Sequence, residues 1–121
     1  MNTGTSDSAA SATARNLFRY CEAEREWVLD TIVALARLES PTSDKTAVDR
    51  CGEELALRLR EIGGAVTRLR QSDAGDHLRA EFGNGTSQVL LIGHFDTVWP
   101  LGQIARMPRH PIRYRNYDRQ Y

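Results

Sequence analysis

The chain has 121 residues, of which 40% are hydrophobic and 26% charged, and its 16 basic and 16 acidic residues give a formal net charge of zero. These values are typical of one small globular domain with a hydrophobic core. The balanced charge argues against a partner that is a nucleic acid or an anionic membrane, and no apolar run approaches the length of a transmembrane helix. No secretory signal is recognisable. The two cysteines, Cys21 and Cys51, fall in segments expected to be helical, so we expect reduced thiols and a cytoplasmic location.

The N-terminal half predicts a leader followed by two helices. Residues 1–15 are rich in Ser, Thr, Ala and Gly, have little to bury, and are expected to be a disordered leader. Apolar residues then recur at helical spacing from Leu17 to Leu38, and Pro41 disfavours helical backbone at the residue before it.

The second helix is predicted from about Lys45 to Ile62, with Ser43 or Asp44 as its N-cap and Gly63-Gly64 as its end. Its charged residues are expected to form a solvated face. Its buried side is predicted to consist of Val48, Cys51, Leu55, Leu59 and Ile62.

The following residues predict strands. Ala65 to Arg70 has modest strand character, and His77 to Phe82 alternates strictly between apolar and polar residues. The Gly83–Ser87 segment has the composition of a hairpin loop. Val89 to Ile92 is apolar on both faces, which predicts a central strand. The expected class is therefore α/β, with two N-terminal helices, a hairpin and a central strand in residues 16–108. We also expect a short helical turn within Leu101–Met107 and an unstructured tail at residues 109–121.

The candidate chemistry lies where the apolar run ends, at Gly93-His94-Phe95-Asp96. Residues two apart on extended backbone point to the same side, so His94 and Asp96 are expected to project together. A neutral imidazole is a good zinc ligand, and a neighbouring carboxylate can fix its tautomer or orient a water molecule. Taken alone, however, a His-x-Asp tripeptide is more often a strand end whose side chains bond to the loop backbone.

The longer segment Leu-Leu-Ile-Gly-His-Phe-Asp-Thr-Val-Trp-Pro resembles the first metal-binding motif of the M20 family of zinc-dependent metallopeptidases. That family includes glutamate carboxypeptidase, acetylornithine deacetylase and succinyl-diaminopimelate desuccinylase. Upstream, Ala34–Thr42 resembles the end of the family's first helix and its Ser-Pro-Ser/Thr turn, and Ile62–Val66 resembles its Gly-Ala-x-Val passage. The resemblance covers about Glu24 to Pro108 and is most specific at Gly93–Val98.

By this resemblance, His94 would ligate one of two zinc ions, for which cobalt could substitute, and Asp96 would be the catalytic aspartate beside it. The implied reaction is carboxypeptidase-like hydrolysis of amide bonds in peptides or N-acyl amino acids. Trp99-Pro100-Leu101-Gly102 leans towards the glutamate carboxypeptidase branch. The substrate-binding residues are not identifiable.

The chain also departs from the family pattern. The family's bridging aspartate, its glutamate pair, its second histidine and its dimerisation domain have no counterpart, and the resemblance stops after Pro108. We therefore expect a truncated N-terminal fragment that is inactive by itself, with a tail that resembles translation in a wrong frame. Other candidate ligands are not expected to form a site. His77 and Glu81 lie on the polar face of a predicted strand, and His110 lies in the tail. Cys21 and Cys51 lie on apolar helix faces and are expected to be core residues. Phe95 and Trp99 are expected to be packing residues.

Two other functions are alternatives to this one. A non-catalytic α/β module could act through protein–protein contacts by pairing an exposed strand edge with a partner chain. The same edge would make the product marginally stable or prone to aggregation. A metallophosphoesterase fits poorly, because those enzymes use Asp-x-His and the order here is His-x-Asp.

Overall fold

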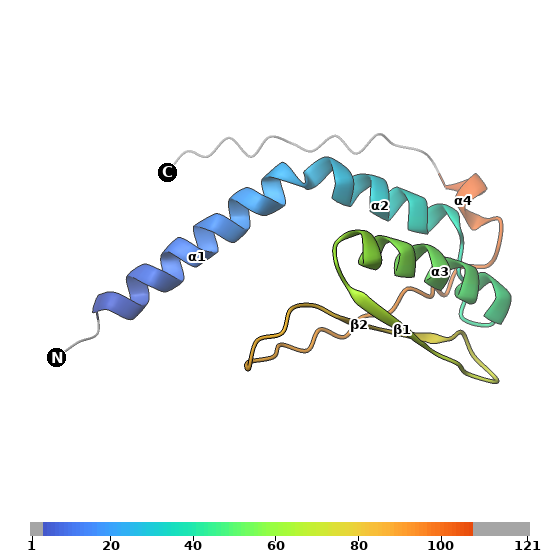
Figure 1. The fold of residues 1–121 in the computed structure, drawn as a ribbon. Helices are drawn as coiled ribbons and strands as arrows, with labels where there is room; N and C mark the ends of the chain where they lie inside the picture. The colour runs from blue at the N-terminus through green and yellow to red at the C-terminus, as the bar shows by residue number, and fades with distance from the viewer. Residues whose placement is uncertain (1–3, 108–121) are drawn as a thin grey trace. The chain divides into compact units, whose positions relative to one another are not determined.

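The computed structural model describes residues 4–107 (Figure 1). Its elements are α1 (Gly4–Ala23), α2 (Arg25–Arg37), α3 (Lys45–Glu61), β1 (Ala65–Leu69), β2 (His77–Glu81) and α4 (Gln103–Arg106). This mixture of helices with a small sheet is compatible with the predicted α/β class. The chain divides into two compact units, one ending at Leu38 and the other beginning at Glu39. None of the helices that residues 4–107 form combines the length and apolarity needed to cross a membrane.

The first unit contains α1 and α2, and it corrects two expectations. The stretch from Gly4 to Ala14 was expected to be disordered, but it forms the first half of α1. Its alanines explain the difference, because alanine has the highest intrinsic helix propensity. Cys21 was expected to be a core residue and is exposed instead. The single predicted helix is interrupted at Glu24, although the backbone bonds Glu24 N–Tyr20 O and Val28 N–Glu24 O continue the helical pattern across it.

In the second unit, α3 begins and ends where the sequence predicts. The side chain of Asp44 caps the helix by accepting a hydrogen bond from the backbone N–H of Ala47 at 2.9 Å. Gly63 ends the helix with φ of +90°, a conformation that side chains with a Cβ avoid. The buried residues of α3 are smaller than expected, and they are Ala47, Val48, Cys51, Gly52 and Ala56. Ile62 was predicted to be buried and is 51% exposed.

The strands β1 and β2 form an antiparallel hairpin, which confirms the two strands predicted between residues 65 and 82. Val66 lies opposite Ala80, and Arg68 lies opposite Leu78. One face of the hairpin packs against α3. The side chain of Val48 lies so close to Gly75 that a Cβ added to this glycine would be 2.1 Å from Cγ1 of Val48. The core of the unit is therefore a thin layer between one helix and two strands.

The predicted central strand is wrong. Residues Val89–Ile92 form no strand, and their relative exposures are 88%, 81%, 89% and 89%. Figure 1 shows this segment as extended backbone that returns from the loop after β2 without becoming an arrow. A strand requires a neighbour to satisfy its N–H and C=O groups, and the sheet of the described chain consists of β1 and β2 alone. The Gly83–Ser87 segment consequently is not a hairpin loop either.

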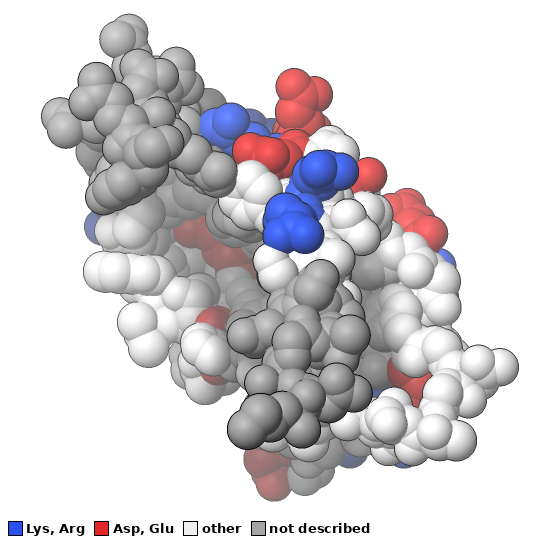
Figure 2. Space-filling model, turned by 90° about the vertical axis from the view of Figure 1, so that its left-hand side faces the viewer, with Lys and Arg blue, Asp and Glu red and all other residues white. Residues whose placement is uncertain are grey.

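The short helix α4 lies within the predicted Leu101–Met107 segment. The predicted unstructured tail at residues 109–121 lies outside the described residues. On the face shown in Figure 2, acidic and basic side chains are interspersed with uncharged ones, and neither sign forms a continuous patch.

Candidate functional site

The segment that carries His94 and Asp96 is held by the turn that follows α2. Pro41 and Thr97 form a parallel β-bridge, in which the backbone N–H of Thr97 donates to Ser40 O at 2.7 Å and that of Thr42 donates to Thr97 O at 2.9 Å. The hydroxyl of Ser40 also donates to Phe95 O at 2.6 Å. These hydrogen bonds pair backbone groups of a segment that lies outside the β1–β2 sheet. They hold the segment in place at Phe95–Thr97.

Glu39 begins this turn and ties down the next part of the loop. Its φ of 46° is the one positive value at a residue other than glycine in the described chain. Its carboxylate accepts hydrogen bonds from the backbone N–H groups of Gly102 at 3.0 Å and Ile104 at 2.9 Å. The N–H of Ile104 is the main cause that lowers the pKa of Glu39, with that of Gly102 next. The turn at residues 39–42 therefore contacts the loop both at Phe95–Thr97 and at the start of α4.

His94 and Asp96 lie next to each other. Nδ1 of His94 is 3.2 Å from Oδ1 of Asp96 and 3.1 Å from its backbone oxygen. The other carboxylate oxygen, Oδ2, accepts a hydrogen bond of 2.6 Å from the hydroxyl of Thr42. The His94 side chain is 84% exposed and that of Asp96 is 29% exposed. The Thr42 hydroxyl is the main cause that lowers the pKa of Asp96, and the contact with His94 acts in the same direction.

Phe95 packs against α3 and anchors the loop there. Its ring lies over Gly52, where a Cβ would be 3.2 Å from two ring carbons, and the Phe95 carbonyl lies 3.8 Å from Sγ of Cys51. Cys51 is 1% exposed, and burial raises the pKa of its thiol. The packing predicted for Phe95 and Cys51 is thus confirmed, whereas Trp99 is 53% exposed.

The donor set around His94 fits one ligand position of a metal site and does not form a complete site. Nδ1 faces the Asp96 carboxylate, so Nε2 is the nitrogen that points away from this contact. A catalytic zinc normally has three protein ligands, and residues 4–107 contain no group of three or more His, Cys, Asp or Glu side chains that could hold a metal ion. His77 and Glu81 are exposed on β2, and Glu81 pairs with Arg79, as expected of residues outside a site. His110 lies outside the described residues.

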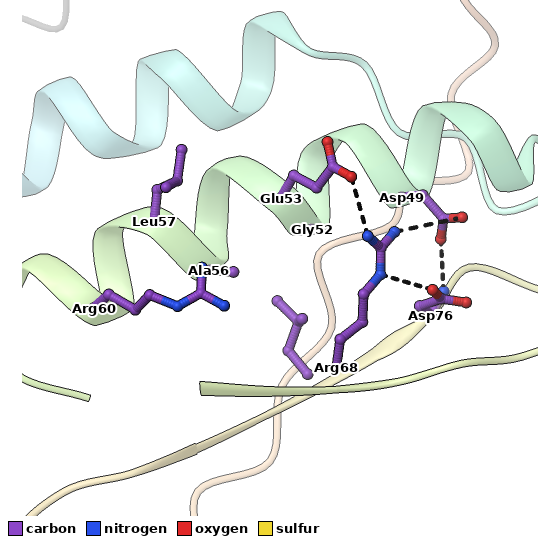
Figure 3. A pocket seen from close by; sticks show the side chains of 9 residues that line it. Asp49, Gly52, Glu53, Ala56, Leu57, Arg60, Arg68 and Asp76 are labelled. Carbon is purple, nitrogen blue, oxygen red and sulfur yellow. Dashed lines mark hydrogen bonds and ion pairs between the residues drawn. The ribbon is translucent and has the colours of Figure 1, made fainter. Parts of the chain in front are cut away.

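A second polar cluster lines a pocket of about 340 Å³ between α3 and the hairpin (Figure 3). Arg68 extends from β1 towards α3 and contacts Asp49, Glu53 and Asp76. Ala56, Leu57 and Leu78 form the apolar part of the wall. The single guanidinium of Arg68 contacts all three carboxylates, so the cluster links α3 to the hairpin.

Sequence reasoning did not assign roles to Ser40 and Thr42. Both belong to the Ser-Pro-Thr turn at residues 40–42, but the partner of Ser40 lies 55 residues further along the chain and that of Thr42 lies 54 residues further. Two hydroxyl residues around a proline, next to a helix end, were the available signal. That signal does not identify the segment which the hydroxyls contact.

Comparison with known proteins shows a similarity over part of the chain. The chain is 30% identical over 95 residues to Carboxypeptidase G2 of Pseudomonas sp. (strain RS-16), an alignment that covers 76% of this chain. The chain spans 23% of the length of that relative. No family model matches the chain, and no solved structure matches it. At a coarse level, the chain is therefore similar to part of a carboxypeptidase.

Proposed function

We propose that this chain forms the part of a metal-dependent peptidase or amidohydrolase of the M20 type that carries the first metal ligand. The similarity to Carboxypeptidase G2 supports the peptidase class. The observation that carries the proposal is the contact of Asp96 with Nδ1 of His94, because it directs Nε2 away from the protein contact. This is the usual arrangement of a ligating histidine and its carboxylate partner.

In this proposal, His94 is the zinc ligand and Asp96 is the catalytic aspartate that orients it. The complete enzyme would hold two zinc ions, with cobalt as a substitute, and would hydrolyse amide bonds of peptides or N-acyl amino acids. The bound metal would supply Lewis-acid polarisation of the substrate carbonyl and an activated water. Residues 4–107 supply one metal ligand, His94. The other ligands and the general base would have to come from outside these residues or from another polypeptide.

Metal binding by His94 is the direct test. The chain is labelled with ¹⁵N at histidine, and its imidazole signals are followed by NMR during addition of Zn²⁺ at pH 8. We expect Zn²⁺ to shift the Nε2 signal of His94, and we expect the His94→Gln variant to lose this response. His77→Gln is the matched control, since that histidine lies on the exposed side of β2. An unchanged His94 signal at saturating Zn²⁺ would refute its role as a ligand.

Hydrolysis of N-acyl amino acids and dipeptides, with added Zn²⁺ or Co²⁺, tests the second part of the proposal. One imidazole beside one carboxylate does not satisfy a catalytic zinc, so we expect the 121-residue chain alone to give no turnover. Turnover that His94→Gln abolishes would support the peptidase class and contradict the proposed need for further ligands.

A second candidate function is a non-catalytic module that acts through protein–protein contacts. The observation in its favour is the exposure of the four aliphatic residues Val89–Ile92, because contiguous exposed apolar surface marks interaction sites. The Zn²⁺ titration separates the two candidates, since a protein-contact module requires no response of His94 to metal.

A further inference from the structure

We propose that Thr42 is a positioning residue whose hydroxyl sets the orientation of the Asp96 carboxylate and thereby the tautomer of His94. The importance of that tautomer for metal binding rests on the proposed function. The positioning itself involves Thr42, Asp96 and His94 alone, and it can be tested without metal.

The two oxygens of Asp96 have different partners. Oδ2 accepts the short 2.6 Å bond from the Thr42 hydroxyl, and Oδ1 lies 3.2 Å from Nδ1 of His94. Rotation about the last side-chain bond of an aspartate is soft. Because the carboxylate is planar, a strong bond that fixes Oδ2 also fixes the direction of Oδ1. The longer contact with His94 is therefore set by the shorter contact with Thr42.

Thr42 is itself held in place. Its backbone N–H donates to Thr97 O at 2.9 Å, next to the bridge between Pro41 and Thr97. Its hydroxyl has a single proton and two acceptors within reach, Asp96 Oδ2 at 2.6 Å and Thr97 O at 3.2 Å. The charged and nearer oxygen is the stronger acceptor. A β-branched side chain also has few χ1 states, which limits the directions that the hydroxyl can take.

The consequence for His94 follows from the acceptors around Nδ1. Both groups near Nδ1 are acceptors, the Asp96 carboxylate and the Asp96 carbonyl. A neutral imidazole therefore carries its proton on Nδ1 and leaves the lone pair on Nε2. Without the Thr42 hydroxyl, the carboxylate can rotate, and the carbonyl remains as a weaker acceptor. The population of the opposite tautomer, with the proton on Nε2, should then rise.

The test measures the His94 tautomer by ¹⁵N NMR at pH 8, without metal. His94→Gln identifies the signals. In the unmodified chain we expect mainly the Nδ1–H form. In Thr42→Val, which replaces the hydroxyl with a methyl group, we expect the ratio of Nε2–H to Nδ1–H to rise about fivefold, the factor that one net hydrogen bond gives.

Thr42→Ser supplies the rescue and Thr67→Val the matched control. The serine variant retains the hydroxyl and should keep the original tautomer ratio. Thr67 is exposed on β1, so its substitution should leave the ratio unchanged. An unchanged ratio in Thr42→Val, or no rescue by serine, would overturn the proposal.

If Thr42→Val does not fold, Asp96→Asn replaces it, because loss of the carboxylate charge should shift the same ratio in the same direction, and a constant ratio would again overturn the proposal. A shifted ratio in Thr42→Val together with no Zn²⁺ response in the unmodified chain would support the positioning role and refute the proposed metal ligand.

Discussion

At the scale of single residues, Asp76 links more parts of the second unit than its loop position suggests. Its side chain is 8% exposed, and it accepts hydrogen bonds from Lys45 Nζ at 2.7 Å, Arg68 Nε at 2.7 Å and the N–H of Gln71 at 2.9 Å. Lys45 is the main cause that holds the pKa of Asp76 well below its ordinary value, and the N–H of Gln71 is the next. One carboxylate thus joins the start of α3, β1 and the turn between the strands.

Asp76→Asn is expected to lower the melting temperature at pH 7. The asparagine amide has no charge, and it has one acceptor oxygen where the carboxylate has two. A depressed pKa means that the folded state binds the proton less readily than the unfolded state. The stabilisation is therefore complete above the ordinary aspartate pKa and is lost as the pH falls towards the folded value. The difference in melting temperature between variant and parent should shrink from pH 7 to pH 3.

Asp73→Asn is the control for this experiment, since Asp73 is exposed in the same turn and bonds to Ser72. Thermal unfolding followed by circular dichroism at several pH values supplies the measurement. A difference that stays constant down to pH 3 would show that Asp76 does not act through its charge.

At the scale of elements, the loop that carries His94 is positioned by packing of Phe95 on α3. Gly52 permits this packing, because the ring lies where a side chain at residue 52 would begin. Alanine at this site would gain about 0.8–1 kcal/mol of helix propensity over glycine, while its Cβ would press on the ring at 3.2 Å. A leucine would add slightly less propensity than alanine and would require the ring to leave its place.

We therefore expect Gly52→Ala to change the free energy of unfolding by no more than about 1 kcal/mol. Gly52→Leu should destabilise the protein, because overpacking costs about 1–3 kcal/mol and outweighs the gain in propensity. Urea unfolding of the two variants gives both values. Equal stability of the leucine and alanine variants would mean that Phe95 does not pack against α3 in solution.

Elements whose signal is local could be predicted from the sequence, and contacts between distant segments could not. The limits of α3 follow from Asp44 and Gly63, and the hairpin follows from the alternation at His77–Phe82. Val89–Ile92 looked like a central strand because every residue is apolar, but a strand is defined by its neighbour, which local composition does not specify. For the same reason His94 and Asp96 could be chosen from a contiguous motif, whereas Thr42, 54 residues from Asp96, could not.

At the scale of the whole molecule, balanced charge and an exposed apolar segment act together. The formal net charge is zero, so two copies of the chain have little overall electrostatic repulsion. Each copy exposes 81–89% of each residue in Val89–Ile92, which belong to no strand in the described part of the chain. Apolar segments of high β-propensity and low charge are the sites at which chains associate. The thin core between α3 and the hairpin has few buried residues to oppose this tendency.

The double variant Leu90→Lys/Leu91→Lys is expected to reduce concentration-dependent self-association, because it places two charges in the middle of the exposed segment. Sedimentation velocity over a range of protein concentrations measures the effect. Ser87→Lys/Gln88→Lys adds the same charge at neighbouring exposed positions, so it separates the loss of apolar surface from the change in net charge. Both side chains of the test pair are already in solvent, and the melting temperature should change little. If the parent is monomeric at every concentration, or if the control pair reduces association equally, then Val89–Ile92 is not the surface through which the chain associates.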